Sequence, residues 1–195
     1  MAAAIAAGAD AVGFVCYPKS PRYVTPLRLR ALSRELSVFV TPVLLFVNAA
    51  SDLVEGALDV MPNAILQFHG EEHEPACSRY AHPYIRSVAM NDDADLARVE
   101  NQFTSATALL VDAPSEDFGG SGRTFNWSKL PTQRAKPLVL AGGLNADNVA
   151  AAIAEAKPYA VDVSSGVEHE PGIKSTSKIK AFVEAVRRAD RIPAG

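Results

Sequence analysis

The chain has 195 residues, of which 48% are hydrophobic and 21% charged, and its formal net charge at pH 7 is -3. This length fits one domain, and the apolar fraction is enough to bury a core without disulfides or metal. The slight acidic excess argues against a nucleic-acid or anionic-membrane surface, which needs clustered Lys and Arg. The expected partner is a small molecule, with no nucleic acid and no membrane, and composition leaves the oligomeric state open.

The expected elements follow the chain as alternating strands and helices. Residues 1–8 have the composition of the second half of a helix that ends at Gly8. Short apolar runs then alternate with helical stretches, which is typical of βα units. The expected strands are Ala11–Tyr17, Pro42–Val47, Ala64–Phe68, Tyr84–Val88, Ala108–Asp112, Leu138–Ala141 and Ala160–Val163. The expected helices are Pro26–Leu36, Ser51–Val60, Glu74–Tyr80, Asp92–Gln102, Ala146–Ala156 and Ser175–Arg188, with an irregular segment near Trp127–Leu130.

This order predicts an α/β fold, a single domain over residues 1–195 built as a TIM (β/α)8 barrel of parallel strands. A half-helix followed by seven strand–helix pairs equals such a barrel with its first strand and the start of its first helix missing. An open doubly wound sheet is the alternative. The apolar run from Val38 to Val47 is short of the roughly 18 to 20 residues that span a bilayer, and the N-terminus has no signal-peptide pattern, so we expect a cytoplasmic protein.

Two glycine-containing segments follow consecutive strands near the C-terminus. Gly142 and Gly143 come after one strand, and Ser164, Ser165 and Gly166 come after the next. Once the missing strand is counted, these segments fill the positions after strands seven and eight, where barrels commonly bind phosphate. Each alone reads equally well as an ordinary left-handed turn, and their coincidence favours phosphate.

Polar side chains share the inward face of three strands. Asp112 has the parity of Leu110, Asp162 lies between two outward valines, and Gln67 and His69 lie opposite Leu66 and Phe68. Polar groups at such positions are costly in a core and reasonable in a pocket. A capping or hydrogen-bonding role is the alternative for any single one.

Two loops add further candidates. Arg22 and Lys19 lie in a loop stiffened by two prolines, where an Arg can clamp a substrate carboxylate through two parallel hydrogen bonds. Lys19 is expected to be an ordinary solvated charge. The segment 118–127 has the glycine content of a mobile active-site loop, although composition is equally consistent with a plain flexible loop.

Eight segments, in order, resemble the phosphoribosylanthranilate isomerase family. They cover essentially the whole chain, and the most distinctive are Tyr-Pro-Lys-Ser-Pro-Arg-Tyr-Val (17–24) and Val-Asp-Val-Ser-Ser-Gly-Val-Glu (161–168). The others are Gly-Ala-Asp-Ala-Val-Gly-Phe-Val (8–15), Phe-Val-Asn (46–48), Gln-Phe-His-Gly (67–70), Leu-Val-Asp-Ala (110–113), Gly-Gly-Ser-Gly-Arg-Thr-Phe-Asn-Trp (119–127) and Leu-Ala-Gly-Gly-Leu (140–144).

The resemblance implies an isomerase of tryptophan biosynthesis. Its reaction is an Amadori rearrangement of N-(5-phosphoribosyl)anthranilate to 1-(2-carboxyphenylamino)-1-deoxyribulose 5-phosphate, by acid and base catalysis without metal or organic cofactor. Asp112 matches the family's general acid and Arg22 its contact to the anthranilate carboxylate. Asp162 matches an inward Asp beside the substrate. The expected phosphate-binding residues are Gly142, Gly143, Ser164, Ser165 and Gly166, and Gln67 and His69 are further expected substrate contacts.

The chain departs from the family at its N-terminus. Members open with a strand carrying Lys-Ile-Cys-Gly, whose Cys is the general base, and the printed sequence has no such motif. Cys16 stands where members commonly have Phe, and Cys77 reads as a small buried residue. We therefore expect impaired turnover, with Met1 an internal residue of the true first helix. A non-catalytic phosphate-ligand binder is the alternative. Indoleglycerol-phosphate synthase, on the same kind of barrel, would need inward catalytic Lys and Glu, and Arg86 is the only inward basic strand residue.

Overall fold

The computed structural model describes residues 1–114 and 124–191, and it is organised around one parallel sheet. Neighbours in the sheet are neighbours in the sequence, in the order β1 to β7. All seven expected strands are present. Their bounds are β1 Ala11–Val15, β2 Thr41–Phe46, β3 Ile65–Phe68, β4 Tyr84–Ala89, β5 Ala108–Asp112, β6 Leu138–Leu140 and β7 Ala160–Val161.

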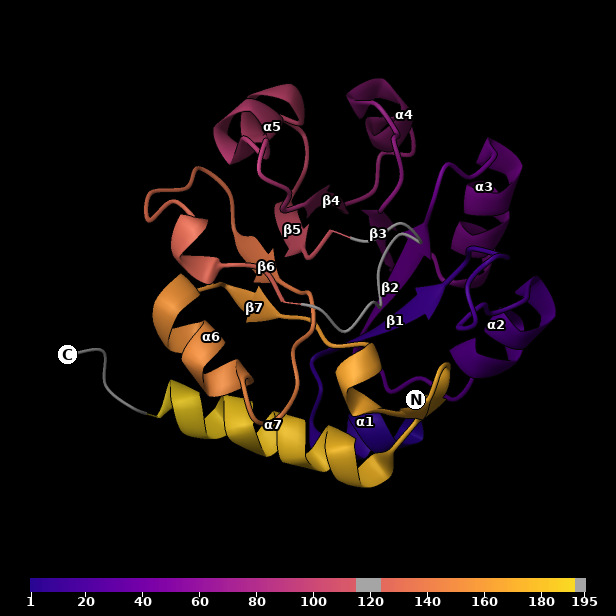
Figure 1. The fold of residues 1–195 in the computed structure, drawn as a ribbon. Coiled ribbons are helices and arrows are strands. Elements are labelled where there is room, and N and C mark those ends of the chain that lie inside the picture. The colour runs from indigo at the N-terminus through magenta and orange to yellow at the C-terminus, as the bar shows by residue number, and fades with distance from the viewer. Residues whose placement is uncertain (115–123, 192–195) are drawn as a thin grey trace.

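The sheet curls into most of a ring, and the helices lie outside it (Figure 1). Within the described residues the ring is not closed, because β1 and β7 are edges that pair on one side only. Sequential strand order with helices on the outer face alone is the (β/α)8-barrel arrangement and excludes the open doubly wound sheet. The helices are α1 Ala2–Ala7, α2 Pro26–Ser33, α3 Ser51–Val60, α4 Glu74–Ser78, α5 Leu96–Gln102, α6 Val149–Ala156 and α7 Thr176–Asp190.

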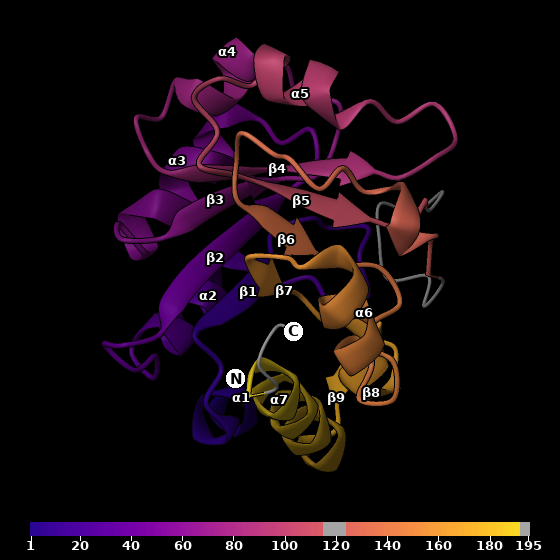
Figure 2. The ribbon, with the colours of Figure 1, turned by 90° about the vertical axis from the view of Figure 1, so that its left-hand side faces the viewer.

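Parallel pairing brings the C-terminal ends of the strands to one rim. Phe68 pairs with Arg86, Ala89 with Asp112, and Val111 with Leu140, so each strand ends close to the level of its neighbour. Figure 2 shows the arrowheads of β4, β5 and β6 pointing to the same side. Polar residues that follow these strands therefore gather at a single face.

The core lies between the ring and its helices. Strand side chains that point outward are almost completely buried, as in Leu44, Leu66 and Leu140 at 0% exposure. Strands covered in this way are expected to be nearly continuous apolar runs, which is how the sequence reads. At the N-terminal end, small alanine side chains of α1 pack near α7, which places the first and last helices side by side (Figure 1).

Local capping explains where several elements begin and end. Gly8 ends α1 in the left-handed region, at φ 92°, and its amide donates to Ala4 and Ile5, as the sequence predicts. The Asp95 carboxylate accepts from the Arg98 amide, so α5 begins at Leu96 and not at Asp92. Asn145 accepts from the amides of residues 147 and 148 in a turn, which delays α6 from Ala146 to Val149.

The expected bounds of α3 and β5 were exact, and others differ by a few residues. Strand β1 ends at Val15 and β7 at Val161, short of Tyr17 and Val163, although the amides of Cys16 and Asp162 still donate to the neighbouring strands. The expected irregular segment near Trp127–Leu130 is a short 3-10 helix, η1 Trp127–Lys129. Of the expected glycine-rich loop over 118–127, residues 118–123 lie outside the described part of the chain.

A small antiparallel hairpin was not predicted. After β7 the chain makes a 3-10 turn, η2 Ser165–Val167, and then pairs β8 Glu168–Glu170 with β9 Ile173–Lys174. Alternation cannot signal strands of two or three residues. The hairpin sits at the same rim as the strand ends (Figure 2).

Replacing Leu44 with Ala should destabilise the protein by about 3 kcal/mol, because this fully buried side chain in β2 packs in the core. The measurement is chemical denaturation followed by circular dichroism. Leu27→Ala, at a residue that is 81% exposed in α2, is the matched control and should change stability by less than about 0.5 kcal/mol. Equal losses in the two variants would contradict this packing.

Candidate active site

A chain of three polar side chains runs across the rim from β3 to β5. Gln67 lies in β3, His69 follows it, and Asp112 is the last residue of β5. Gln67 Nε2 lies 3.2 Å from His69 Nδ1, and His69 Nε2 lies 3.4 Å from Asp112 Oδ2. An amide nitrogen can only donate, so Nδ1 accepts and the proton of the neutral imidazole sits on Nε2, facing the carboxylate. The shared inward parity of Gln67 and His69 is thus confirmed.

Asp162 lies one residue beyond β7, and its charge interacts with that of Asp112. Protein mass around Asp162 and then the negative charge of Asp112 raise its pKa, while His69 and Lys174 act in the opposite direction. Solvent reaches the Asp162 side chain, so repulsion between the two carboxylates is the firmer cause of this direction. Two carboxylates with different surroundings at one rim are a typical arrangement for moving protons.

The two glycine-containing segments lie against each other and against β5. Gly142 has a φ of 84°, and a Cβ there would lie 2.5 Å from the Ala113 nitrogen and 3.0 Å from Asp112 Oδ1. A Cβ at Gly166 would lie 1.8 Å from the carbonyl oxygen of Leu144. Both positions need glycine because backbone approaches too closely for any side chain. The loop after β6 is therefore packed next to Asp112, and the loop after β7 is packed against the loop after β6.

Arg22 is engaged within the protein. Its Nε donates to Glu168 Oε1 at 2.7 Å and one of its Nη atoms donates to Oε2 at 2.6 Å. Lys174 Nζ donates to Glu168 Oε1 at 2.8 Å and also to the carbonyl oxygen of Ser164 at 2.8 Å. Burial alone would raise the pKa of Glu168, but the hydrogen bonds from Arg22 and Lys174 outweigh it and lower the pKa to about 2.

A second ion pair holds the loop after β3. Arg86 donates to Glu72 Oε2 at 2.9 Å and to the Gly70 carbonyl oxygen at 2.6 Å. The Glu72 carboxylate also accepts from the backbone amides of Asn48 and Gly70. These contacts fix the loop that carries His69. The guanidinium of Arg86, the inward basic strand residue of the sequence analysis, therefore has a structural role in holding this loop.

Sequence reasoning missed Glu168, Lys174 and Glu72. In the sequence, Glu168 is the last residue of the segment 161–168, and nothing distinguishes Lys174 from the other lysines. Their partners Arg22 and Ser164 are 146 and 10 residues away along the chain, respectively. Only a three-dimensional arrangement connects such pairs, so no local pattern could have identified them.

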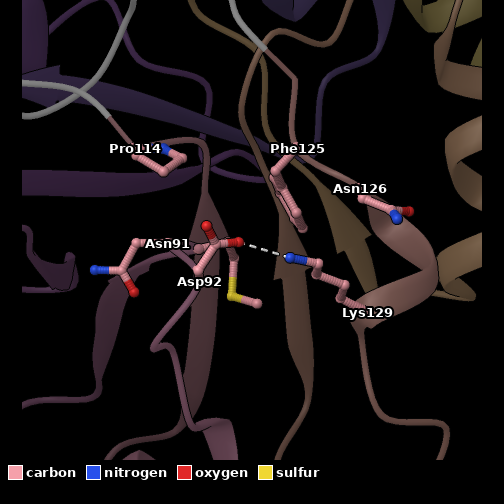
Figure 3. Close-up of a pocket in the computed structure, with 7 residues that line it drawn as sticks. Asn91, Asp92, Pro114, Phe125, Asn126 and Lys129 are labelled. Atoms are coloured by element: carbon pink, nitrogen blue, oxygen red, sulfur yellow. Dashed lines mark hydrogen bonds and ion pairs between the residues drawn. The ribbon is translucent and has the colours of Figure 1, made fainter.

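Two hollows border this rim. One, of about 420 Å³, is lined by His69, Arg86, Asp112 and residues of α5. The other, of about 350 Å³, lies between the ends of β4 and β5 and the segment before η1. Figure 3 shows its lining side chains Pro114 and Phe125, with the ion pair between Asp92 and Lys129 beside them, whose atoms are 2.8 Å apart.

Both cysteines are buried. Cys16 and Cys77 are free thiols in the core, at 3% and 0% exposure. Burial raises the pKa of each to about 12. Neither is a thiolate near neutral pH, which agrees with the sequence-based interpretation that Cys16 is no relocated base and that Cys77 is a small buried residue.

The fold and the site define a (β/α)8-barrel enzyme whose polar groups meet at the C-terminal ends of the strands. Residues 1–185 match the family described as N-(5'-phosphoribosyl)anthranilate (PRA) isomerase. The chain belongs to this family.

Similar proteins agree with this assignment. The chain is 50% identical to the N-(5'-phosphoribosyl)anthranilate isomerase of Dechloromonas aromatica over 96% of this chain and 90% of that protein. The crystal structure of the phosphoribosyl anthranilate isomerase of Thermotoga maritima superimposes with a TM-score of 0.87 at 40% identity, covering 96% and 92% of the two chains. A second phosphoribosyl anthranilate isomerase structure is a complex with reduced 1-(o-carboxyphenylamino)-1-deoxyribulose 5-phosphate. It superimposes with a TM-score of 0.84 at 37% identity, covering 96% of this chain and 92% of that chain.

Within the described residues, no helix is long and apolar enough to cross a membrane, and no cluster of acidic, His and Cys side chains is arranged to hold a metal ion.

Acid should weaken the fold through Glu168. A carboxyl group whose pKa is lowered on folding stabilises the protein above its unfolded value of 4.5, and this contribution is lost as pH falls through about 2. From about pH 5 to about pH 2, wild-type stability should therefore fall by about 3 kcal/mol more than that of Glu168→Gln. Urea denaturation at several pH values measures this. Glu170→Gln, at an exposed carboxylate of the same hairpin, should keep the wild-type pH profile.

Proposed function

We propose that this protein is a phosphoribosylanthranilate isomerase of tryptophan biosynthesis, and that Asp112 is its general acid. The observation that supports this most strongly is the position of Asp112. It ends strand β5 with its carboxylate 3.4 Å from His69 Nε2 and next to Gly142, whose loop packs against the loop that carries Gly166. A phosphorylated sugar anchored at those loops would present its reacting carbons to this carboxyl group.

The proposed reaction begins with ring opening. In its protonated form, Asp112 donates a proton to the furanose ring oxygen, the bond from C1′ to that oxygen breaks, and the lone pair of the anthranilate nitrogen forms a C=N bond. A base then removes the C2′ proton, and the released electrons give the enolamine. Tautomerisation leaves a ketone at C2′ and a protonated C1′. No atom is gained or lost, so the conversion needs no oxidant and, in this proposal, no metal or organic cofactor.

The proposed substrate contacts come from four places on the rim. The phosphate is placed at Gly142, Gly143, Ser164, Ser165 and Gly166, where close-packed backbone leaves main-chain amides as donors. The anthranilate carboxylate is placed at Arg22. Gln67 and His69 are further substrate contacts next to Asp112, and Asp162 lies beside the substrate. The partner is a small phosphorylated molecule. A cytoplasmic location completes the proposal, because free thiols such as Cys16 and Cys77 are typical of a reducing compartment.

The expected impairment and the alternative of a non-catalytic binder find no support in the comparisons. Relatives that the chain matches over 85% to 91% of their length carry isomerase names. The two cysteines of the chain are both buried in the core, so the base that removes the C2′ proton is not assigned to either.

Asp112→Asn should lower turnover by about 100-fold or more, because an amide cannot supply the proton. Binding of the reduced product analogue, measured by calorimetry, should change little. Asp92→Asn is the matched control, since this exposed carboxylate lies at the same rim without touching the proposed substrate position. Wild-type protein that binds the analogue but converts no substrate would overturn the isomerase proposal in favour of a binder. Near-normal turnover in Asp112→Asn would remove Asp112 as the acid.

Gly166→Ala should raise KM by about 10-fold while kcat changes less, because the new Cβ must push the loop away from Leu144 and disturb the phosphate cradle. Inorganic phosphate should compete with substrate in the wild type and less well in the variant. Gly56→Ala, in α3 with open space around the new Cβ, provides the control. If KM and phosphate competition are both unchanged in Gly166→Ala, the substrate phosphate does not bind at this loop.

A further inference from the structure

The ion pair between Arg22 and Glu168 joins two loops that follow unpaired edges of the sheet. Arg22 lies in the loop after β1, and Glu168 opens the hairpin after β7. The side chain of Glu168 is only 5% exposed and that of Arg22 15%. A buried carboxylate with such partners is held firmly, since separating the pair would leave an uncompensated charge. The proposed reaction steps do not use this ion pair, so its role needs a separate explanation.

We propose that Glu168 is a positioning residue that aims Arg22 at the substrate carboxylate and thereby sets the preference for an anthranilate ring over an unsubstituted aniline ring. The inference rests on the proposed function. It assigns to Glu168 no contact with substrate. Its effect passes through the guanidinium of Arg22.

The hydrogen-bond stoichiometry of the guanidinium supports this role. Arg carries five N–H donors in a planar fork. Glu168 takes the side-on pair, one from Nε and one from an Nη atom. Within residues 1–114 and 124–191, no other acceptor of the Arg22 guanidinium is seen. The end-on pair, one N–H from each Nη, is therefore left to receive a carboxylate through two parallel bonds. Because the group is planar, fixing one edge also fixes the direction of the other.

The charges around Glu168 leave room for a second carboxylate. Arg22 and Lys174 both contact Glu168, so two cations share this one carboxylate. Arg22 therefore has positive charge available for an anthranilate carboxylate while it stays paired with Glu168. Without Lys174, two carboxylates would share Arg22 alone, and their repulsion would oppose binding. Lys178 strengthens the arrangement by donating to the carbonyl oxygen of Glu168 at 2.7 Å.

The hairpin also supports the Arg22 loop directly. Gly172, with a φ of 82°, lies so close to Pro21 that a Cβ there would be 2.6 Å from the Pro21 carbonyl oxygen. Lys174 Nζ donates both to Glu168 and to the carbonyl oxygen of Ser164, which lies in the proposed phosphate cradle. One hairpin, residues 168–174, thus connects the place proposed for the phosphate with the place proposed for the carboxylate. These contacts would set the separation of the two ends of the substrate.

Paired ligands test the inference. Binding of the reduced product analogue to wild type, Glu168→Gln and Arg22→Ala is measured by calorimetry, alongside the same compound without its ring carboxylate. Glu168→Gln should raise the dissociation constant of the analogue by about 10-fold and that of the decarboxylated compound by less than about 2-fold. The double variant should bind no more weakly than Arg22→Ala alone, because Glu168 acts through Arg22.

Controls separate positioning from a loss of folding. Glu170→Gln, in the same hairpin with an exposed side chain, should bind both compounds like the wild type. Circular dichroism confirms that each variant is folded at the assay temperature. Should Glu168→Gln not fold, Glu168→Asp replaces it. The shorter side chain keeps the charge but cannot reach both guanidinium nitrogens equally, and the same ligand-selective loss is expected.

Each remaining outcome counts against a stated claim. Equal weakening of both compounds would show that Glu168 merely stabilises the fold, and unchanged binding of the analogue would show that it does not aim Arg22. Either result overturns the inference and leaves the isomerase proposal intact. Wild-type protein that binds neither compound would overturn the proposed function and this inference with it.

Discussion

Seven strands that run in one direction determine where every polar group of the site lies. Parallel pairing puts all the C-terminal strand ends at one rim, and the two-residue period of a strand decides which side chains face inward there. Both constraints decide the position of Asp112, because it is the last residue of β5 and its side chain faces inward. A shift of one residue would turn it, and Gln67 and His69 likewise, out of the site. The chemistry thus depends on backbone register more than on any single contact.

Two buried ion pairs then hold the loops that the strands leave behind. Arg86 and Glu72 fix the loop that carries His69, and Arg22 and Glu168 join the loops beyond β1 and β7. Buried pairs contribute little net stability compared with well-packed apolar groups, but breaking one is costly. Their effect is therefore to make loop positions definite. The hydrogen-bonded chain from Gln67 through His69 to Asp112 includes a residue of the first of these loops.

Glycines act at the same rim by removing side chains. Gly142 lets the backbone pass next to Ala113, and Gly166 lets it pass next to Leu144. These approaches bring the loops after β6 and β7 together. A glycine in such a place serves close packing, whereas Gly56 has open space around it and serves no such need.

The sequence by itself determined the seven strands, their order and the inward face that carries Gln67, His69 and Asp112. It could do so because apolar runs and their periodicity are local properties. It also located the glycines that the loops need. Only the tertiary structure decided that Arg22 is paired with Glu168, that Lys174 reaches Ser164, and that a hairpin follows β7. These contacts join residues whose separation along the chain carries no pattern, and they form only when the sheet curls and brings its two edges near each other.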